Sequence, residues 1–305
     1  MKRNVLCVVE LDNYPEDVVA RAAWLAKLYD CDLELVLSDP IMNHLGENFI
    51  YFADLQALTD SVQSDMEAIL QGLAISAEEL GVTVRTSTST DRPEAYMIAS
   101  KAEDCDALFV VKGTQWHSPS KRASLGDTDW RLIRRIESPL WFAKPKPFPK
   151  QPVVVAAVDP THSRDKGATL DHEIIRQAQS VVEKCDGKLL LFHSYERLEE
   201  IGTRVTWKFK PEKLPLDKLD EKIRNEHRKV LQELASEFGV AAAAVHQLPG
   251  RTHDLLPTFA RANGASLVVM GGRARSGIKH RFVGSTATRV LDHMHCDVLV
   301  AHAQE

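Results

Sequence analysis

The chain repeats itself, and this repeat constrains the fold more than any other feature of the sequence. The segment ALFVVKG at 107–113 corresponds to ASLVVMG at 265–271, 158 residues later. The same offset aligns SPLWFAKP at 138–145 with CDVLVAHA at 296–303. Near the start of each copy the offset falls to 147, so the second copy carries about 11 extra residues. We therefore expect two similar domains.

Each copy alternates short apolar runs with segments whose apolar residues recur at helical spacing. In the second copy, strands are predicted at 153–158, 188–193, 240–246, 266–270 and 297–302. These runs are apolar on both faces, which is typical of strands in a parallel sheet covered on both sides by helices. The pattern predicts the α/β class for both copies.

The segment KPKPFPKQP at 144–152 separates the copies. Its prolines are compatible with neither a helix interior nor a central strand. We therefore expect a domain boundary here, with domains at 1–148 and 149–305.

Composition excludes several classes of protein. The chain has 305 residues, a net charge of -5, and no apolar run near the ~20 residues that span a bilayer. Neither a nucleic-acid partner nor a membrane partner is expected. The five cysteines are scattered and odd in number, which favours free thiols in the cytoplasm over a disulfide framework.

A glycine-bearing loop near the C-terminus is the strongest sign of a binding site. The apolar run 267–270 ends at Gly271 and Gly272, a basic loop follows, and Gly284-Ser285 precedes an amphipathic segment. Glycines let a backbone approach a phosphate, and the free N–H groups of a helix start point at it. The loop matches neither the Walker P-loop nor the Rossmann fingerprint.

The spacing Gly271-x2-Ala274-x9-Gly284-Ser285 resembles the signature of the universal stress protein family. The likeness covers the whole second copy, and the repeated chain is similar to the tandem type of this family. The resemblance implies two doubly wound, five-stranded parallel sheets with helices on both faces. It also implies a cytoplasmic role in the stress response.

Dimers in this family pair through the fifth strand. The resemblance therefore implies that the strands at 139–143 and 297–302 pair within one chain as an intramolecular pseudo-dimer. A monomer of this kind or a further homodimer is compatible with the sequence, and the protein partner stays unknown.

In members that keep the signature, the resemblance implies binding of ATP or AMP, with or without Mg²⁺. By position, Asp159 and Ser194 lie at the ribose and adenine. The phosphate loop comprises Gly271, Arg273, Ala274, Gly284, Ser285 and Thr286. Ala274 departs from the signature glycine, and alanine costs about 1 kcal/mol or more where a positive φ is needed.

The first copy departs further, with Gly113, Trp116, Gly126 and Asp127 at the equivalent positions. Tryptophan would fill a phosphate cradle, and a carboxylate would repel phosphate in the absence of a metal. We predict that the first copy does not bind nucleotide. Its aromatic residues, which include Trp130 and the segment at 49–52, belong to the core or line a site for an apolar ligand.

Other interpretations of the chemistry remain open. His293, His295 and Cys296 crowd together, but their spacing is not a standard zinc pattern, so zinc is not expected. No strong catalytic constellation is present. A weak ATPase would need Mg²⁺ and a carboxylate, for which Asp159 is the candidate. A regulatory scaffold without nucleotide is the other alternative.

Overall fold

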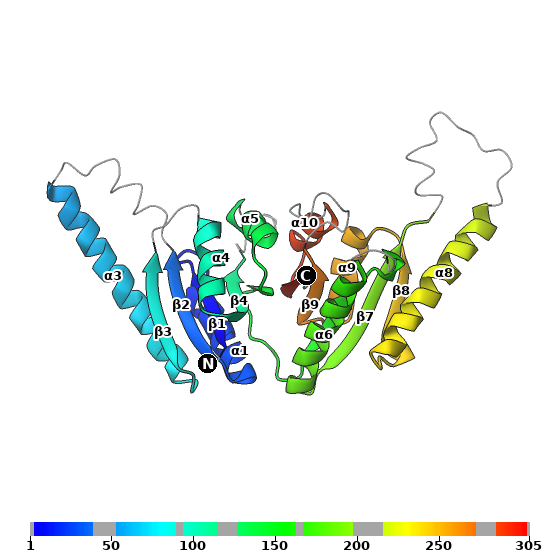
Figure 1. The fold of residues 1–305 in the computed structure, drawn as a ribbon, viewed down its shortest axis with the longest axis horizontal. Coiled ribbons are helices and arrows are strands. Elements are labelled where there is room, and N and C mark those ends of the chain that lie inside the picture. Colours follow the sequence, from blue (N-terminus) through cyan, green and yellow to red (C-terminus); the bar gives the residue numbers. More distant parts are fainter. Residues whose placement is uncertain are drawn as a thin grey trace, which may run out of the picture. The chain divides into compact units, whose positions relative to one another are not determined.

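The structure is a computed structural model of the chain. It describes residues 3–38, 53–89, 94–114, 127–162, 167–197, 216–272 and 285–303. The chain forms two compact units, and the first consists of the chain up to Phe148 together with Asp297–Val300. Figure 1 shows the order of strands and helices along the chain.

Strands and helices alternate in the first repeat, as the sequence pattern predicts. The elements are β1 (Asn4–Val9), α1 (Pro15–Tyr29), β2 (Asp32–Ser38), α3 (Ala53–Glu78), β3 (Val84–Ser89), α4 (Glu94–Asp104), β4 (Ala107–Gly113), α5 (Asp127–Arg135) and β5 (Leu140–Ala143). Helix α1 begins at a proline, whose fixed φ suits the first helical position. It stops at Asp30, whose left-handed backbone directs its N–H to the carbonyls of Ala26 and Lys27.

The second repeat has the same alternation. Its elements are β6 (Val153–Ala157), α6 (Gly167–Cys185), β7 (Lys188–Tyr195), α8 (Leu216–Glu237), β8 (Val245–Pro249), α9 (Thr252–Ala262), β9 (Leu267–Gly271), α10 (Ser285–Leu291) and β10 (Asp297–Ala301). Strand β8 begins later than predicted. Ala242–Ala244 form a 3-10 turn instead, closed by a 2.8 Å bond from the Ala244 N–H to the Ala241 carbonyl.

The first unit contains a parallel sheet in the order β3-β2-β1-β4-β5. The chain moves outward from β1 to β3, then returns to β4 on the other side of β1. Because crossovers between parallel strands are right-handed, this reversal places α1 and α3 on one face and α4 and α5 on the other. The sheet is therefore doubly wound, as expected.

Strand β10 joins the sheet of the first unit, although it is the last strand of the second repeat. It pairs antiparallel with β5, with Leu299 opposite Trp141 and Val300 opposite Leu140. This confirms the predicted pairing of the two fifth strands within one chain. All residues of β5 and β10 are buried.

Asp297 anchors β10 to the first unit. Its carboxylate accepts hydrogen bonds from the Trp141 indole at 2.7 Å and the Lys144 backbone N–H at 2.9 Å. It also forms an ion pair with Arg21, and each of these two side chains is 4% exposed. The Arg21 guanidinium donates to the Lys146 carbonyl as well and lies over the ring of Phe148. The last strand and the start of the linker thus share one buried arginine.

The second unit contains the parallel strands β9-β6-β7-β8. The same reversal places α6 and α8 on one face and α9 and α10 on the other. Helix α8 lies along the outer strands β7 and β8, as α3 does along β2 and β3 in the first unit (Figure 1). Central strands β6 and β9 are apolar on both sides, which matches their position between two layers of helices.

Candidate functional site

In each unit the strand order reverses beside the first strand of the repeat. In the first unit the reversal lies between β1 and β4, and in the second between β6 and β9. Open α/β sheets bind ligands at the carboxyl ends of the strands that flank such a reversal. The ends of β6 and β9 therefore define the candidate site of the second unit.

Asp159 lies at this edge, two residues beyond the end of β6. It is half-buried, and its backbone N–H donates to the Asp171 carboxylate of α6 at 3.0 Å. One of its carboxylate oxygens accepts a 2.7 Å bond from the Thr161 hydroxyl. Asp171 is only 2% exposed. These contacts fix the loop after β6.

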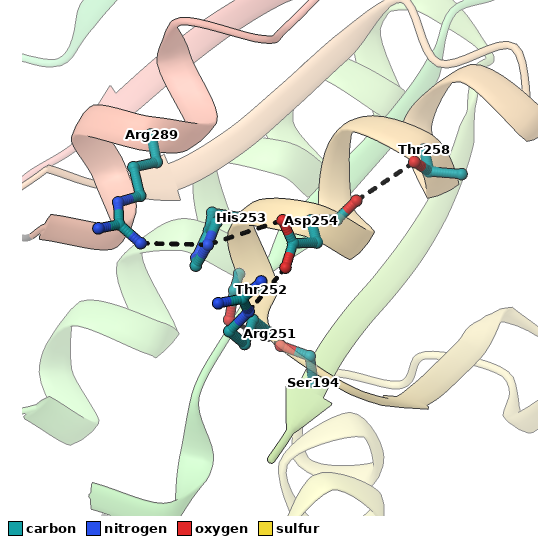
Figure 2. Close-up of polar contacts among 7 residues, drawn as sticks. All are labelled: Ser194, Arg251, Thr252, His253, Asp254, Thr258 and Arg289. Carbon is teal, nitrogen blue, oxygen red and sulfur yellow. Dashed lines mark hydrogen bonds and ion pairs between the residues drawn. The ribbon is translucent and has the colours of Figure 1, made fainter. Parts of the chain in front are cut away.

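Ser194 stands near the end of the neighbouring strand β7. Its hydroxyl lies 2.7 Å from the hydroxyl of Thr252, the first residue of α9 (Figure 2). This bond joins the carboxyl end of β7 to the start of α9, which covers the face of the sheet opposite α6 and α8. Ser194 on β7 and Asp159 just after β6 thus lie at the same edge of the sheet, because β6 and β7 are neighbouring strands.

Gly271 ends β9 and completes the described part of the edge. A Cβ at this position would lie 2.7 Å from Cδ2 of Leu170 on α6. Glycine therefore lets the side chain of Leu170 lie against the end of the strand, independently of any ligand. Packing against Leu170 and binding of a ligand are compatible roles for Gly271, because a backbone without a side chain also leaves room for a ligand.

The remaining predicted site residues lie largely outside the described part of the chain. Arg273, Ala274 and Gly284 fall in the segment between Gly272 and α10, which lies outside the described residues. Ser285 is the first residue of α10, followed by Thr286, and the side chains of both are also outside them.

A pair of histidines supports the β6 end of the edge, and the sequence pattern did not identify it. His193 of β7 is 1% exposed, and its Nδ1 lies 3.0 Å from the carbonyl oxygen of Val158. Its Nε2 lies 2.8 Å from Nδ1 of His227 on α8. Since a carbonyl only accepts, Nδ1 of His193 donates to Val158, and the other ring nitrogen of His193 shares a hydrogen bond with His227. The pair holds the residue that precedes Asp159.

The equivalent edge of the first unit carries a buried ion-pair network. Lys112, near the end of β4, is 3% exposed and lies between two carboxylates. Its Nζ is 2.6 Å from Glu10, just beyond β1, and 3.0 Å from Asp129 on α5. These three side chains, here called the Lys112 triad, occupy the reversal point of the first sheet.

Charge pairing outweighs desolvation for the lysine of the triad. Burial opposes its positive charge, yet the carboxylates of Asp129 and Glu10 raise the pKa of Lys112 above its ordinary value. Burial raises the pKa of Glu10, and the ammonium of Lys112 partly offsets this rise. The triad is thus a compact unit whose charges depend on one another.

The structure describes only some of the first-copy residues that correspond to the phosphate loop. A Cβ on Gly113 would lie 2.8 Å from the Asn13 side chain and 3.0 Å from its backbone oxygen, so this glycine also serves close packing. Trp116, Gly126 and the residues at 49–52 lie outside the described residues. Asp127 begins α5, but its side chain is not described; Trp130 is half-buried on the same helix.

The zinc alternative gains no support from the part of the chain that the structure describes. No group of three histidine, cysteine or acidic residues there is placed to hold a metal. His293 is exposed with its Nδ1 bonded to the Arg289 carbonyl, whereas Cys296 is buried. In the same described segments, no helix combines the length and apolarity needed to cross a membrane.

The groups that the sequence pattern missed share one detectable signal. Lys112, Arg21 and Asp297 are each a charged residue within an otherwise apolar run or helix face. Charged residues are almost never fully buried unless paired, so such a position predicts a buried partner elsewhere. The partner itself is distant in sequence and cannot be identified by local pattern.

Two doubly wound repeats, each with a reversal of strand order beside its first strand, define a tandem α/β protein of Rossmann-like class. Comparison with known families then gives the family. The model described as "Universal stress protein family" matches residues 1–144 and 153–302. The chain therefore belongs to the universal stress protein family.

Full-length relatives share the tandem organisation. The chain is 26% identical over 300 residues to universal stress protein E of Escherichia coli K12, covering 98% of this chain and 94% of the relative. The predicted likeness to the tandem type is thereby confirmed. A putative universal stress protein from Pseudomonas aeruginosa has the same fold, with a TM-score of 0.69, 23% identity, and coverage of 98% of this chain and 93% of its own. A universal stress protein from Archaeoglobus fulgidus aligns with a TM-score of 0.68, 16% identity, and coverage of 99% and 98%.

Proposed function

We propose that this stress-response protein binds a nucleotide of the ATP or AMP type at the second unit alone. The supporting observation is that Asp159, Ser194 and Gly271 lie at the carboxyl ends of the neighbouring strands β6, β7 and β9, beside the reversal point of the second sheet. The loop that follows Gly271 carries the family signature through Ser285, except that Ala274 replaces its second glycine. Family membership supports the stress-response role.

The two reversal points explain the asymmetry of this proposal. Lys112, Asp129 and Glu10 correspond by the repeat to Met270, Ala287 and Ala157. Met270 and Ala287 are buried, and none of the three residues at these positions of the second edge is charged. An adenine ring and ribose favour an apolar floor with a few polar groups, which the second edge offers. The first edge presents two carboxylates, which disfavour a phosphate.

Nucleotide titration of the full chain tests the proposal, with a matched pair of variants. Asp159 and Asp12 are equivalent positions after the first strand of each repeat, and Asp12 is exposed. We expect one equivalent of ATP or AMP per chain by isothermal titration calorimetry, in the presence and absence of Mg²⁺. Asp159→Ala should weaken binding about ten-fold or more, because it removes a charged hydrogen-bonding group. Asp12→Ala should leave affinity unchanged.

Three results would contradict the proposal. They are no binding of either nucleotide, two equivalents per chain, or equal losses of affinity in the two variants. The first result would favour a regulatory scaffold, whereas the other two would place nucleotide at the first unit as well. Turnover of bound ATP, measured in the same samples, addresses the weak-ATPase alternative.

A further inference from the structure

A groove runs between α9 and α10 on the face of the second sheet opposite α6 and α8. It encloses about 330 Å³, which is near the lower end of the range for small-molecule sites. Its walls include His253, Asp254, Pro257 and Arg261 from α9, and Arg289 and His293 from α10 and the turn after it. We call this feature the α9–α10 groove; Figure 2 shows its histidine end.

The groove carries an excess of positive charge. Asp254, the acidic residue of its described lining, already forms a 2.7 Å ion pair with Arg251 at the start of α9. Among the described residues, neither Arg261 nor Arg289 contacts a carboxylate. In this part of the chain, two guanidinium groups on opposite walls thus lack an anionic partner, and guanidinium is the side chain best suited to phosphate.

The positive charge of the groove depends on pH through the protonation of His253. Its Nε2 lies 3.3 Å from the Arg289 guanidinium, which can only donate, so the neutral ring accepts (Figure 2). Burial lowers the pKa of His253, and the nearby charges of Arg251 and Arg289 lower it further, while Asp254 and Glu196 act in the opposite direction. A bound anion would offset the arginine charges and favour protonation of the ring.

The corresponding positions of the first unit are filled by their own side chains. By the repeat, Tyr96 corresponds to Asp254 and Arg135 to His293. The Arg135 guanidinium stacks over the Tyr96 ring at 3.3 Å. Nearby, the Thr128 hydroxyl donates to Glu94 at 3.1 Å. Arg135 therefore has an aromatic partner within the first unit, and the first unit carries Glu103 where the second carries Arg261.

We propose that the α9–α10 groove is a second ligand site, distinct from the nucleotide edge, that binds a small phosphate-bearing anion between Arg261 and Arg289. His253 takes up a proton as the anion binds. The protonated ring adds positive charge beside the ligand, so its contribution to binding is larger at pH 6 than at pH 8.

Inorganic pyrophosphate is a suitable probe, titrated into the full chain by isothermal titration calorimetry. Arg289→Gln and Arg261→Gln should each weaken binding about ten-fold, as expected for the loss of one charge-assisted pair. Arg176→Gln is the matched control, because Arg176 is exposed on α6, which covers the opposite face of the sheet. Its affinity for pyrophosphate should equal that of the unmodified protein.

The proton linkage has its own control. Pyrophosphate titrates in the same pH range, so the unmodified chain is compared with His253→Gln at pH 6 and pH 8. The glutamine keeps an acceptor for Arg289 but binds no proton. Protonation of pyrophosphate weakens binding at pH 6 in both proteins, so the ratio of affinity at pH 6 to affinity at pH 8 should be higher in the unmodified chain than in His253→Gln. Equal ratios would overturn the role assigned to His253.

Separation from the nucleotide edge is tested with Asp159→Ala. Pyrophosphate affinity should be unchanged in this variant and in the presence of saturating AMP, whether or not AMP itself binds. Loss of pyrophosphate binding in Asp159→Ala, or competition by AMP, would assign the anion to the nucleotide edge and overturn the second site. Absence of pyrophosphate binding, or equal affinities of the groove variants and Arg176→Gln, would also overturn it.

Discussion

The two reversal points of this protein share a backbone arrangement but differ in chemistry. In the first unit, Lys112 pairs with both Glu10 and Asp129 within hydrogen-bonding distance. In the second, the positions equivalent to Lys112 and Asp129 are the buried Met270 and Ala287. The charged side chains at the first edge pair with one another, whereas the equivalent positions at the second edge carry apolar side chains.

The same contrast recurs between the helices that cover one face of each sheet. Tyr96 and Arg135 stack on one another in the first unit, whereas Arg261 and Arg289 line an open groove in the second. A duplicated fold can therefore keep its sheet while one copy fills its surface features with its own side chains. Three kinds of substitution and a change of pH test this contrast.

The largest effect is expected from Lys112→Met, which places the second unit's residue in the first. It leaves Glu10 and Asp129 close together without their cation, so the first unit should lose about 3–5 kcal/mol of unfolding free energy. Urea unfolding followed by circular dichroism measures the loss. The reciprocal residue needs no partner, so Met270→Leu should change the stability of the second unit by less than about 1.5 kcal/mol.

A triple variant distinguishes charge from packing. Glu10→Ala, Lys112→Met and Asp129→Ala together reproduce the second unit's residues, and replacing a whole buried ion network by apolar groups is often close to neutral. The triple variant should recover most of the stability lost in Lys112→Met. If it is as unstable as the single variant, lost packing and not unpaired charge explains the effect.

An intermediate effect is expected from alanine at the two glycines that end β4 and β9. At Gly113 the new Cβ meets the backbone oxygen of Asn13 at 3.0 Å, whereas at Gly271 it meets the flexible end of Leu170. We expect a cost of about 2 kcal/mol for Gly113→Ala and roughly 1 kcal/mol for Gly271→Ala. Thermal unfolding measures the stability of both variants. A larger loss of stability in Gly271→Ala than in Gly113→Ala would show that Leu170 at the start of α6 yields less than Asn13 does.

The smallest effect concerns pH. The folded-state pKa of His253 is lowered, so its contribution to stability is present above the ordinary histidine pKa near 6.5 and is lost as pH falls through the folded value. Between pH 7 and pH 5 the unmodified chain should lose more stability than His253→Gln. Urea titrations at several pH values measure the difference, and an identical pH dependence would exclude a perturbed His253.

The repeat and its alternation of strands and helices were sufficient to predict the fold. Apolar runs such as 107–113 recur at a fixed offset, and local periodicity determines element type. The start of β8 was mispredicted because Val240 and the alanines at 241–244 continue the apolar pattern, whereas Ala242–Ala244 form a 3-10 turn. Hydrophobicity alone does not distinguish the two conformations.

The candidate site was predictable only where the chain itself carries a pattern. Asp159 and Gly271 follow apolar strands, so their positions at the sheet edge could be inferred from sequence. The His193–His227 pair could not, because it joins residues 34 positions apart whose proximity depends on the tertiary fold, and the same holds for Lys112 and Glu10. In the α9–α10 groove, likewise, Arg261 and Arg289 approach only because α9 and α10 cover the same face.

The position of β10 has a consequence for how the protein is made. Asp297, which pairs with Arg21, is synthesised about 150 residues after the end of β5. At ~5–20 residues per second, the first repeat emerges roughly 8–30 s before the strand that covers its edge exists. Over that interval the edge of β5 lacks its final neighbour and Arg21 lacks its carboxylate, which favours engagement by a chaperone. Limited proteolysis of ribosome-bound chains arrested before and after residue 297 measures this dependence, and equal protection of β5 in both would contradict it.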